Sequence, residues 1–169
     1  MGGTVVLFSQ SCGNGDMMRM APVEYLFNTF DEIEEQCRLV TMPSHNSKEA
    51  IDCATLVAKI ILLARKGYSK EDIIHKLNIV LCEKEIKQFN YTCSSTIDVC
   101  LYALFTTDSF DSANLKVLSY GGDVDTNAYI VGGMVEAMYG IDEQYIKKVN
   151  KIIPEEFKKV LKRVYKCLK

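Results

Sequence analysis

Several features are missing from this chain, and each absence excludes a class of protein. No stretch approaches the roughly 20 apolar residues of a membrane-spanning helix, so no membrane association is expected. The opening segment 1–8 lacks the cationic start and the long apolar run of a secretion signal. No Cys-x-x-C pair occurs, which argues against a structural zinc site. A formal net charge of −2 gives no cationic excess, so nucleic-acid binding is not predicted either.

The chain also lacks any obvious division. No linker rich in Pro, Gly or Ser and no internal repeat interrupts its 169 residues, which is an ordinary length for one domain. We therefore predict a single domain over residues 1–169. The seven cysteines are an odd number and lie in apolar runs, a pattern typical of small buried hydrophobes in a reducing compartment. The expected location is cytoplasmic.

Apolar residues recur at helical spacing through most of the sequence. The cleanest pattern begins at a candidate cap, Asn46, with Glu49 three residues later, and runs to a stop at Gly67. Ser69 and Asp72 predict a second helix start by the same logic. Further helices are predicted over residues 97–105, 112–119, 128–139 and 154–168. The predicted fold is therefore all-α, a single-domain orthogonal helix bundle, with residues 1–20 largely loop.

The most informative stretch is Gly121–Ala128, which reads Gly-Gly-Asp-Val-Asp-Thr-Asn-Ala. Aspartate oxygens are hard ligands for Mg²⁺ or Mn²⁺, and paired glycines allow a tight turn that aims Asp123, Asp125 and Thr126 at one point. The alternative is that Asp125 caps the helix that follows, since aspartate is favoured there. Further along, Gly132 and Gly133 leave a bare patch for close helix packing or for a ligand.

A second glycine-rich segment, Ser11–Pro22, lies about a hundred residues earlier. Its Gly-Asn-Gly turn, residues 13–15, exposes backbone N–H groups that can hold a phosphate or a ribose hydroxyl. A tight turn with Asn14 in a left-handed conformation is the alternative. Asp16 would repel a diphosphate unless it points away or meets a cation.

Together these segments resemble the ADP-ribosylglycohydrolase family, the dinitrogenase reductase-activating glycohydrolase-like enzymes that cleave ADP-ribose from proteins and related acceptors. Three blocks occur in the family's order: the segment Ser11–Pro22, the pair Ser44-His45 followed by Glu49-Ala50, and Gly121–Gly140. The resemblance covers residues 2–146. It implies an all-helical fold and a glycosidase that hydrolyses N- or O-glycosyl ADP-ribose linkages.

The resemblance also implies roles for individual residues. The implied substrate-binding residues are Ser11, Gly13, Asn14, Gly15, His45 and Gly122. Asp123, Asp125 and Thr126 match part of the family's metal-ligand set for Mg²⁺ or Mn²⁺ and would act in catalysis through the metal. On the family pattern Arg19 ties the loop to the acidic cluster by pairing with a carboxylate such as Asp123, and a contact with phosphate is the alternative.

One family motif is missing. Family members carry a Thr-Asp-Asp motif ahead of the glycine loop, and here only Thr107-Asp108-Ser109 comes near it, in the wrong order. We therefore expect an N-terminally truncated version of the fold, with one bound ion rather than two. The segment Asp31–Glu35 could supply substitute ligands, although its spacing favours an exposed acidic face.

Three functional hypotheses follow. The first is a hydrolase of ADP-ribosyl linkages acting on an ADP-ribosylated protein, and the second is a catalytically impaired relative, a pseudoenzyme, that binds ADP-ribose or a partner. The third is a product without independent activity. Loss of helices would expose apolar area for an oligomer or a partner to cover. The lysines of the segment 154–168 indicate a solvated face, with partner binding as the alternative.

Overall fold

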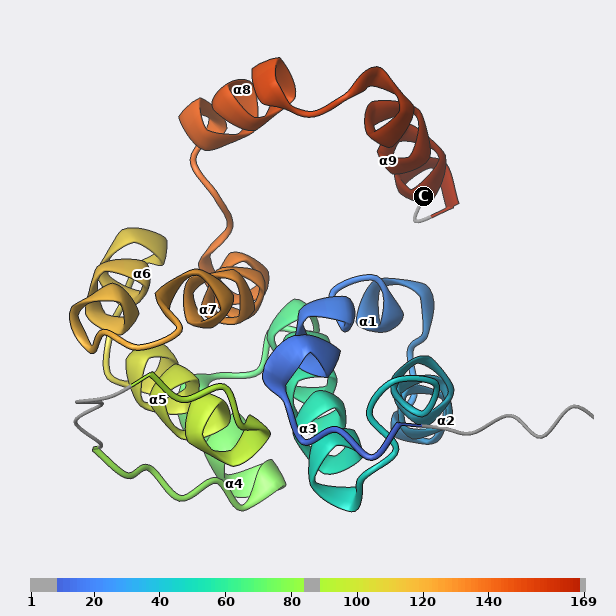
Figure 1. Cartoon of the computed structure of the whole chain (residues 1–169). Coiled ribbons are helices and arrows are strands. Elements are labelled where there is room, and N and C mark those ends of the chain that lie inside the picture. The colour runs from blue at the N-terminus through green and yellow to red at the C-terminus, as the bar shows by residue number, and fades with distance from the viewer. Residues whose placement is uncertain (1–8, 84–88, 168–169) are drawn as a thin grey trace, which may run out of the picture.

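The structure is a computed structural model that describes residues 9–83 and 89–167. Within those residues it contains a 3₁₀ helix, η1 (Asn14–Arg19), and nine α-helices but no strand, which confirms the predicted all-α class (Figure 1). The α-helices are α1 (Val23–Leu26), α2 (Phe30–Thr41), α3 (Lys48–Arg65), α4 (Lys70–Leu77), α5 (Cys93–Phe105), α6 (Phe110–Ser119), α7 (Val124–Tyr139), α8 (Glu143–Ile152) and α9 (Glu155–Cys167). The helix η1 lies within the segment expected to be largely loop.

The long helices α3 and α7 form the centre of the bundle. Helix α3 packs against α1, α2, α4, α5 and α7, while α7 also packs against α5, α6 and η1. At Gly133, an added Cβ would lie 3.9 Å from Ile61 Cδ1 of α3, and at Gly132 it would lie 3.9 Å from Asn114 Oδ1 of α6. The bare patch on α7 therefore serves close helix packing, because both glycines face neighbouring helices.

Helix starts follow the capping chemistry of the sequence with one shift. Helix α3 is capped by Ser47, whose side chain accepts a hydrogen bond from Ala50 N, and not by Asn46 as predicted. The predicted box at Ser69 and Asp72 is present at α4. Helix α2 also has a capping box, formed by Thr29 and Glu32, which was not predicted from the sequence.

The last two helices leave the bundle and form an arm over it (Figure 1). We define the C-terminal arm as residues 142–167. None of the side chains described in it, through residue 166, is buried. Helix α9 confirms the predicted C-terminal helix, but its apolar stripe does not enter the core, and α8 was not predicted.

Two expectations concern the surroundings of the protein. No helix among the described residues is long and apolar enough to cross a membrane. The described cysteines at positions 12, 37, 53, 82, 93 and 100 are all unpaired, in line with a chain that relies on no disulfide framework there. Three of these, Cys37, Cys93 and Cys100, are buried, whereas Cys12 and Cys82 are exposed.

Candidate functional site

The glycine-rich loop is held against the starts of two helices. Asn14 N donates to Tyr91 O at 2.8 Å, and Cys93 N, at the first residue of α5, donates to Cys12 O at 2.9 Å. On the other side, Ser47 Oγ, at the cap of α3, donates to Ser11 O at 3.3 Å. The loop is therefore fixed by backbone contacts to segments far from it in sequence.

The loop reaches a third helix start through the side chain of Asn14. Asn14 Nδ2 donates to Asp123 Oδ2 at 2.8 Å and to Thr96 Oγ1 at 3.0 Å. Asn14 is 7% exposed, Asp123 is 9% exposed and Thr96 is 1% exposed. The two motifs that the sequence singled out, 109 positions apart at this bond, thus meet in one place.

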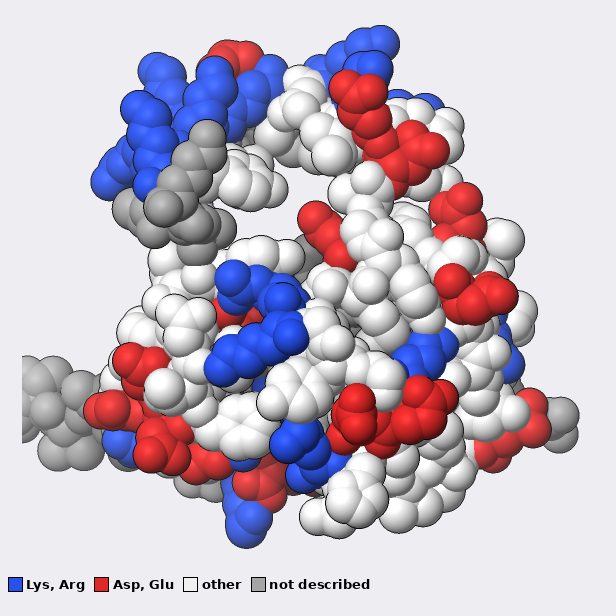
Figure 2. Space-filling model, turned by 180° about the vertical axis from the view of Figure 1, so that it is seen from behind, with Lys and Arg blue, Asp and Glu red and all other residues white. Residues whose placement is uncertain are grey.

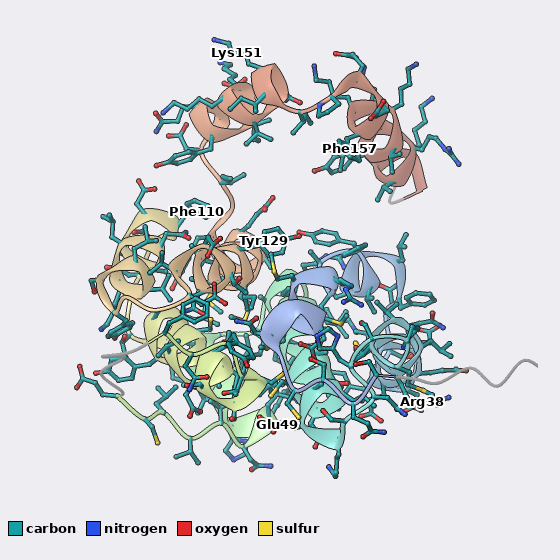
Figure 3. The ribbon with its side chains drawn as sticks, in the orientation of Figure 1. Arg38, Glu49, Phe110, Tyr129, Lys151 and Phe157 are labelled. Atoms are coloured by element: carbon teal, nitrogen blue, oxygen red, sulfur yellow. The ribbon has the colours of Figure 1, made fainter. Side chains whose placement is uncertain are left out.

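The starts of α3, α5 and α7 therefore gather around one loop. Helix N-termini carry partial positive charge and unpaired N–H groups, which favour anionic ligands. The exposed Glu49, labelled in Figure 3, lies near the start of α3, and its Oε1 accepts from Ser94 N at 3.0 Å, which joins the starts of α3 and α5. The arrangement suits an anionic ligand with a polar, hydrogen-bonding body.

The two aspartates of the Gly121–Ala128 motif occupy different positions at the start of α7. Asp123 is the N-cap residue but makes no side-chain capping hydrogen bond, and Asp125 lies exposed in the first turn. The pKa of Asp125 is lowered, first by a hydrogen bond with the Asp123 side chain and then by the backbone of Thr126 and of Asp125 itself. Asp125 is thus not the cap residue, and the two carboxylates lie next to each other.

His45 borders the glycine loop, and its ring is held from behind. His45 Nδ1 and Ser44 Oγ lie 2.7 Å apart, and Arg19 Nη1 donates to Ser44 Oγ at 2.8 Å. An added Cβ at Gly13 would lie 3.7 Å from His45 Nε2, and one at Gly15 would lie 3.8 Å from it. The Nε2 edge of the imidazole therefore faces the loop.

Arg19 does not have the partner that the family pattern suggested. Its guanidinium contacts Ser44 Oγ and, at 3.4 Å, Val40 O, while Asp123 receives its hydrogen bond from Asn14 instead. The pairing of Arg19 with Asp123 was therefore wrong. Arg19 positions the Ser44-His45 pair rather than the acidic cluster.

Asp16 points away from solvent. Its side chain is fully buried, Cys93 Sγ donates to its Oδ1 at 3.5 Å, and its Oδ2 lacks a partner among the described residues. Burial raises the pKa of this carboxyl. Asp16 therefore points away from a ligand at the loop surface, which is one of the two arrangements expected for it.

The glycine pair ahead of α7 has the backbone that its sequence predicts. Gly121 and Gly122 have φ of +74° and +75°, a region that residues with a side chain rarely adopt. The turn brings the chain from α6 to Asp123. Gly122 is exposed beside Asp123, where its backbone is open to a ligand.

The donor set for a metal is small. Within the parts of the chain that the structure describes, no cluster of three or more His, Cys, Asp or Glu side chains could hold an ion. Asp123, Asp125 and the half-buried Thr126 offer two carboxylates and a hydroxyl. These oxygens fit one hard cation whose remaining ligands are water or substrate. They are too few to hold two metal ions. The segment Asp31–Glu35 lies on α2 as an exposed acidic face.

Some residues of the site were not identified from the sequence. Thr96 is a buried polar residue in α5 that looks like any other position of an apolar helix, and only its bond to Asn14 marks it. Ser47 was not predicted as the cap of α3, because the neighbouring Asn46 is itself a candidate cap. Tyr91, whose Cδ2 would lie 3.9 Å from a Cβ at Gly13, stands in an irregular segment without helical periodicity.

These features define a class of protein: an all-helical bundle whose glycine loop meets an aspartate motif at gathered helix starts. The model of the ADP-ribosylglycohydrolase family matches residues 1–168, and the chain belongs to that family. Its sequence is 27% identical over 158 residues to the ADP-ribosylarginine hydrolase Tri1 of Pseudomonas putida (strain GB-1). That match covers 82% of this chain and 42% of the hydrolase.

A solved structure supports the fold. The chain is similar to one described as an ADP-ribosylglycohydrolase-related protein complex, with a TM-score of 0.68 and 20% sequence identity. The similarity covers 76% of this chain and 50% of that chain. The chain therefore spans half or less of the length of these two relatives.

Proposed function

We propose that this chain binds the ADP-ribose part of an ADP-ribosylated protein at the junction of the glycine loop with α7 and hydrolyses its glycosidic bond. Family membership supports the reaction class. The hydrogen bond from Asn14 to Asp123, which joins the glycine loop to α7, is the observation that supports the position of the proposed binding site. The similarity to an ADP-ribosylarginine hydrolase makes arginine the first acceptor to test. We also propose that the chain works in the cytoplasm, a reducing compartment in which the free thiols of the described cysteines would persist.

Different residues of the proposed site contact different parts of the ligand. The backbone N–H of Gly15 and the positive starts of α3 and α5 hold the diphosphate, while the N–H of Gly13 donates to Ser11 Oγ at 3.1 Å and fixes the shape of the loop. His45 Nε2 donates to the same part of the ligand across the loop. Asp123 and Asp125 face the ribose next to the bond that breaks, where positive charge develops on the sugar ring, and their negative charge stabilises it.

One Mg²⁺ or Mn²⁺ belongs to this proposal, held by Asp123, Asp125 and Thr126. When bound, it supplies a Lewis acid that polarises the ribose hydroxyls. Asn14 keeps the Asp123 carboxylate in place through its hydrogen bond, and Thr96 orients the Asn14 amide. Thermal unfolding tests the ion: Mg²⁺ or Mn²⁺ together with ADP-ribose should raise the melting temperature more than the sum of their separate effects.

The activity is tested with an ADP-ribosylarginine substrate and Mg²⁺ or Mn²⁺, with release of free ADP-ribose as the readout. Asp123→Ala and Asp125→Ala should each lower the rate at least about 100-fold, because each removes charge next to the reacting carbon. Asp31→Ala, an exposed carboxylate on α2, is the matched control and should keep full activity. No release by the wild-type chain would reject the hydrolase proposal.

A second function is favoured by the small donor set: recognition of ADP-ribose without turnover. Only two carboxylates meet at the start of α7, and residues 9–83 and 89–167 contain no group of three or more His, Cys, Asp or Glu side chains that could hold a metal ion. Calorimetry with ADP-ribose separates the alternatives, because binding without release identifies a recognition module. A flat titration would reject both and leave a partner role, for an oligomer or a second protein that covers exposed apolar surface.

A further inference from the structure

The C-terminal arm has an apolar face that nothing in the described part of this chain covers. Ile146 and Val149 of α8 are 45% and 50% exposed, and Phe157 and Leu161 of α9 are 57% and 45% exposed. Their spacing of three and four residues places each pair on one side of its helix. A helix that shows its apolar side to water forgoes the burial that normally stabilises it.

Both apolar faces point into the same hollow. A cavity of about 650 Å³ lies between the arm and the end of α7 and is lined by residues of both arm helices, including Tyr145, Val149, Ile153, Leu161 and Tyr165. None of the candidate ADP-ribose site residues lines it. Figure 3 shows Phe157 directed from α9 toward the hollow. The hollow is therefore a separate feature of the molecule.

Charge is divided between the arm and the rest of the chain. The segment from Asp142 to the last residue contains nine Lys and Arg but four Asp and Glu, whereas residues 1–141 contain eleven Lys and Arg but eighteen Asp and Glu. Figure 2 shows Lys and Arg gathered on the outer surface of the arm, and Lys158 and Lys162 of α9 also line the hollow, whose other arm residues are mainly apolar. The arm is thus basic, with an inner face that is mainly apolar, and the body is acidic overall.

We propose that the C-terminal arm is a homodimerisation element and that the occupant of the hollow is the arm of a second copy. Two hook-shaped arms that clasp each other bring their inner, apolar faces into contact. The outer, basic face of each arm then faces the acidic body of the other copy. One two-fold arrangement therefore covers the apolar faces of both arms and brings each basic face against an acidic body. In such an isologous interface the same surface of each copy makes the contact.

The arm of a second copy explains the direction of the apolar faces, which a membrane surface does not. A basic amphipathic helix can lie on anionic lipid, but it must then turn its apolar face outward. Here the apolar sides of α8 and α9 converge on each other around the hollow. Gly140, at φ +75°, makes the bend between α7 and the arm, a conformation that a residue with a side chain would strain. The proposal concerns assembly and does not depend on ADP-ribose hydrolysis.

Sedimentation equilibrium of the full chain, from about 1 µM to about 100 µM, tests the proposal. We expect a species of twice the 19.1 kDa chain mass at the upper end. Val149→Asp with Leu161→Asp should weaken association at least about 100-fold, because the change places charge in the apolar contact. Both positions are solvent-exposed in the single chain, so the circular dichroism and melting of the dilute variant should match those of the dilute wild type.

The matched control is Leu115→Asp on α6, a leucine 68% exposed outside the arm, which should leave association unchanged. Lys159→Glu with Arg163→Glu on the outer face should weaken the dimer about 10-fold and reduce its salt dependence. A monomer at every concentration would overturn the proposal. So would a dimer that survives Val149→Asp with Leu161→Asp, or binding of the monomer to anionic lipid vesicles through the arm.

Discussion

At the scale of single residues, the candidate site depends on one buried amide. Both bonds that Asn14 Nδ2 donates go to groups on other helices, Thr96 of α5 and Asp123 at the start of α7. No other described contact joins the glycine loop to the aspartate motif so directly. The position of the Asp123 carboxylate therefore follows from the position of the loop.

Asn14→Ala should accordingly weaken ADP-ribose binding by about 10-fold or more, because a nearly buried carboxylate loses its donor. Calorimetric titration with ADP-ribose measures the effect. Asn150→Ala, an exposed amide on α8, is the control and should bind like the wild type. Equal affinities for Asn14→Ala and wild type would show that the loop and the aspartate motif do not form one site.

A second buried group sets the pH dependence of stability. Glu24 is fully buried, and its two carboxyl oxygens have no partner from other described residues. Burial raises its pKa from 4.5 to about 9, so the folded protein holds this side chain protonated at neutral pH. The unfolded chain ionises it, and stability is therefore complete below pH 4.5 and falls as the pH rises toward about 9.

Glu24→Gln removes this proton uptake while keeping the shape of the side chain. We expect the free energy of unfolding of the variant to exceed that of the wild type by on the order of 5 kcal/mol at pH 8 and by little at pH 4. Urea unfolding at the two pH values measures the difference. A constant difference between the variants across this range would contradict the raised pKa.

At the scale of helices, side chains at the caps decide where several elements begin. Thr29 Oγ1 accepts from Glu32 N, and Thr29 N donates to Glu32 Oε2 at 3.0 Å, which closes the capping box of α2. Thr29→Ala should lower the free energy of unfolding by about 1 kcal/mol, because the backbone N–H of Glu32 loses its acceptor, Thr29 Oγ1. Asn28→Ala, the exposed neighbour, is the control for the same denaturation experiment and should change little.

Helix content could be predicted from the sequence wherever apolar residues recur densely. Helices α3, α5 and α7 present such stripes and bury them. Helix α2 was missed because only Ile33 and Cys37 among its apolar residues are buried, and the acidic residues between them resemble a surface loop. Helix α8 buries no residue, so its sequence carries no signal from the core.

The site could be predicted only where motifs carried it. The glycine loop and the Asp123 motif were identified by their composition, and the structure brings them together. The predicted partner of Arg19 was wrong, because a contact between the end of a short 3₁₀ helix and an irregular segment leaves no periodic trace in the sequence. Thr96 was missed for a related reason: a threonine in an apolar helix gives no sign of which residue it will bond.

At the scale of the whole molecule, the chain has two features on different surfaces. Three helix starts and the glycine loop form the candidate ligand site on the body. The C-terminal arm forms the apolar hollow with the far end of α7. Ligand binding and self-association should therefore be separable, with the arm variants keeping ADP-ribose affinity in calorimetry.

The central claim is that the glycine loop and the aspartate motif bind ADP-ribose as one site. Amide chemical shifts of the isotope-labelled chain, followed during a titration with ADP-ribose and Mg²⁺, test it most directly. We expect the perturbed amides to lie in residues 11–16, 45–50, 92–97 and 121–127, with α9 unaffected. Perturbations confined to the arm, or none at all at saturating ADP-ribose, would contradict the claim.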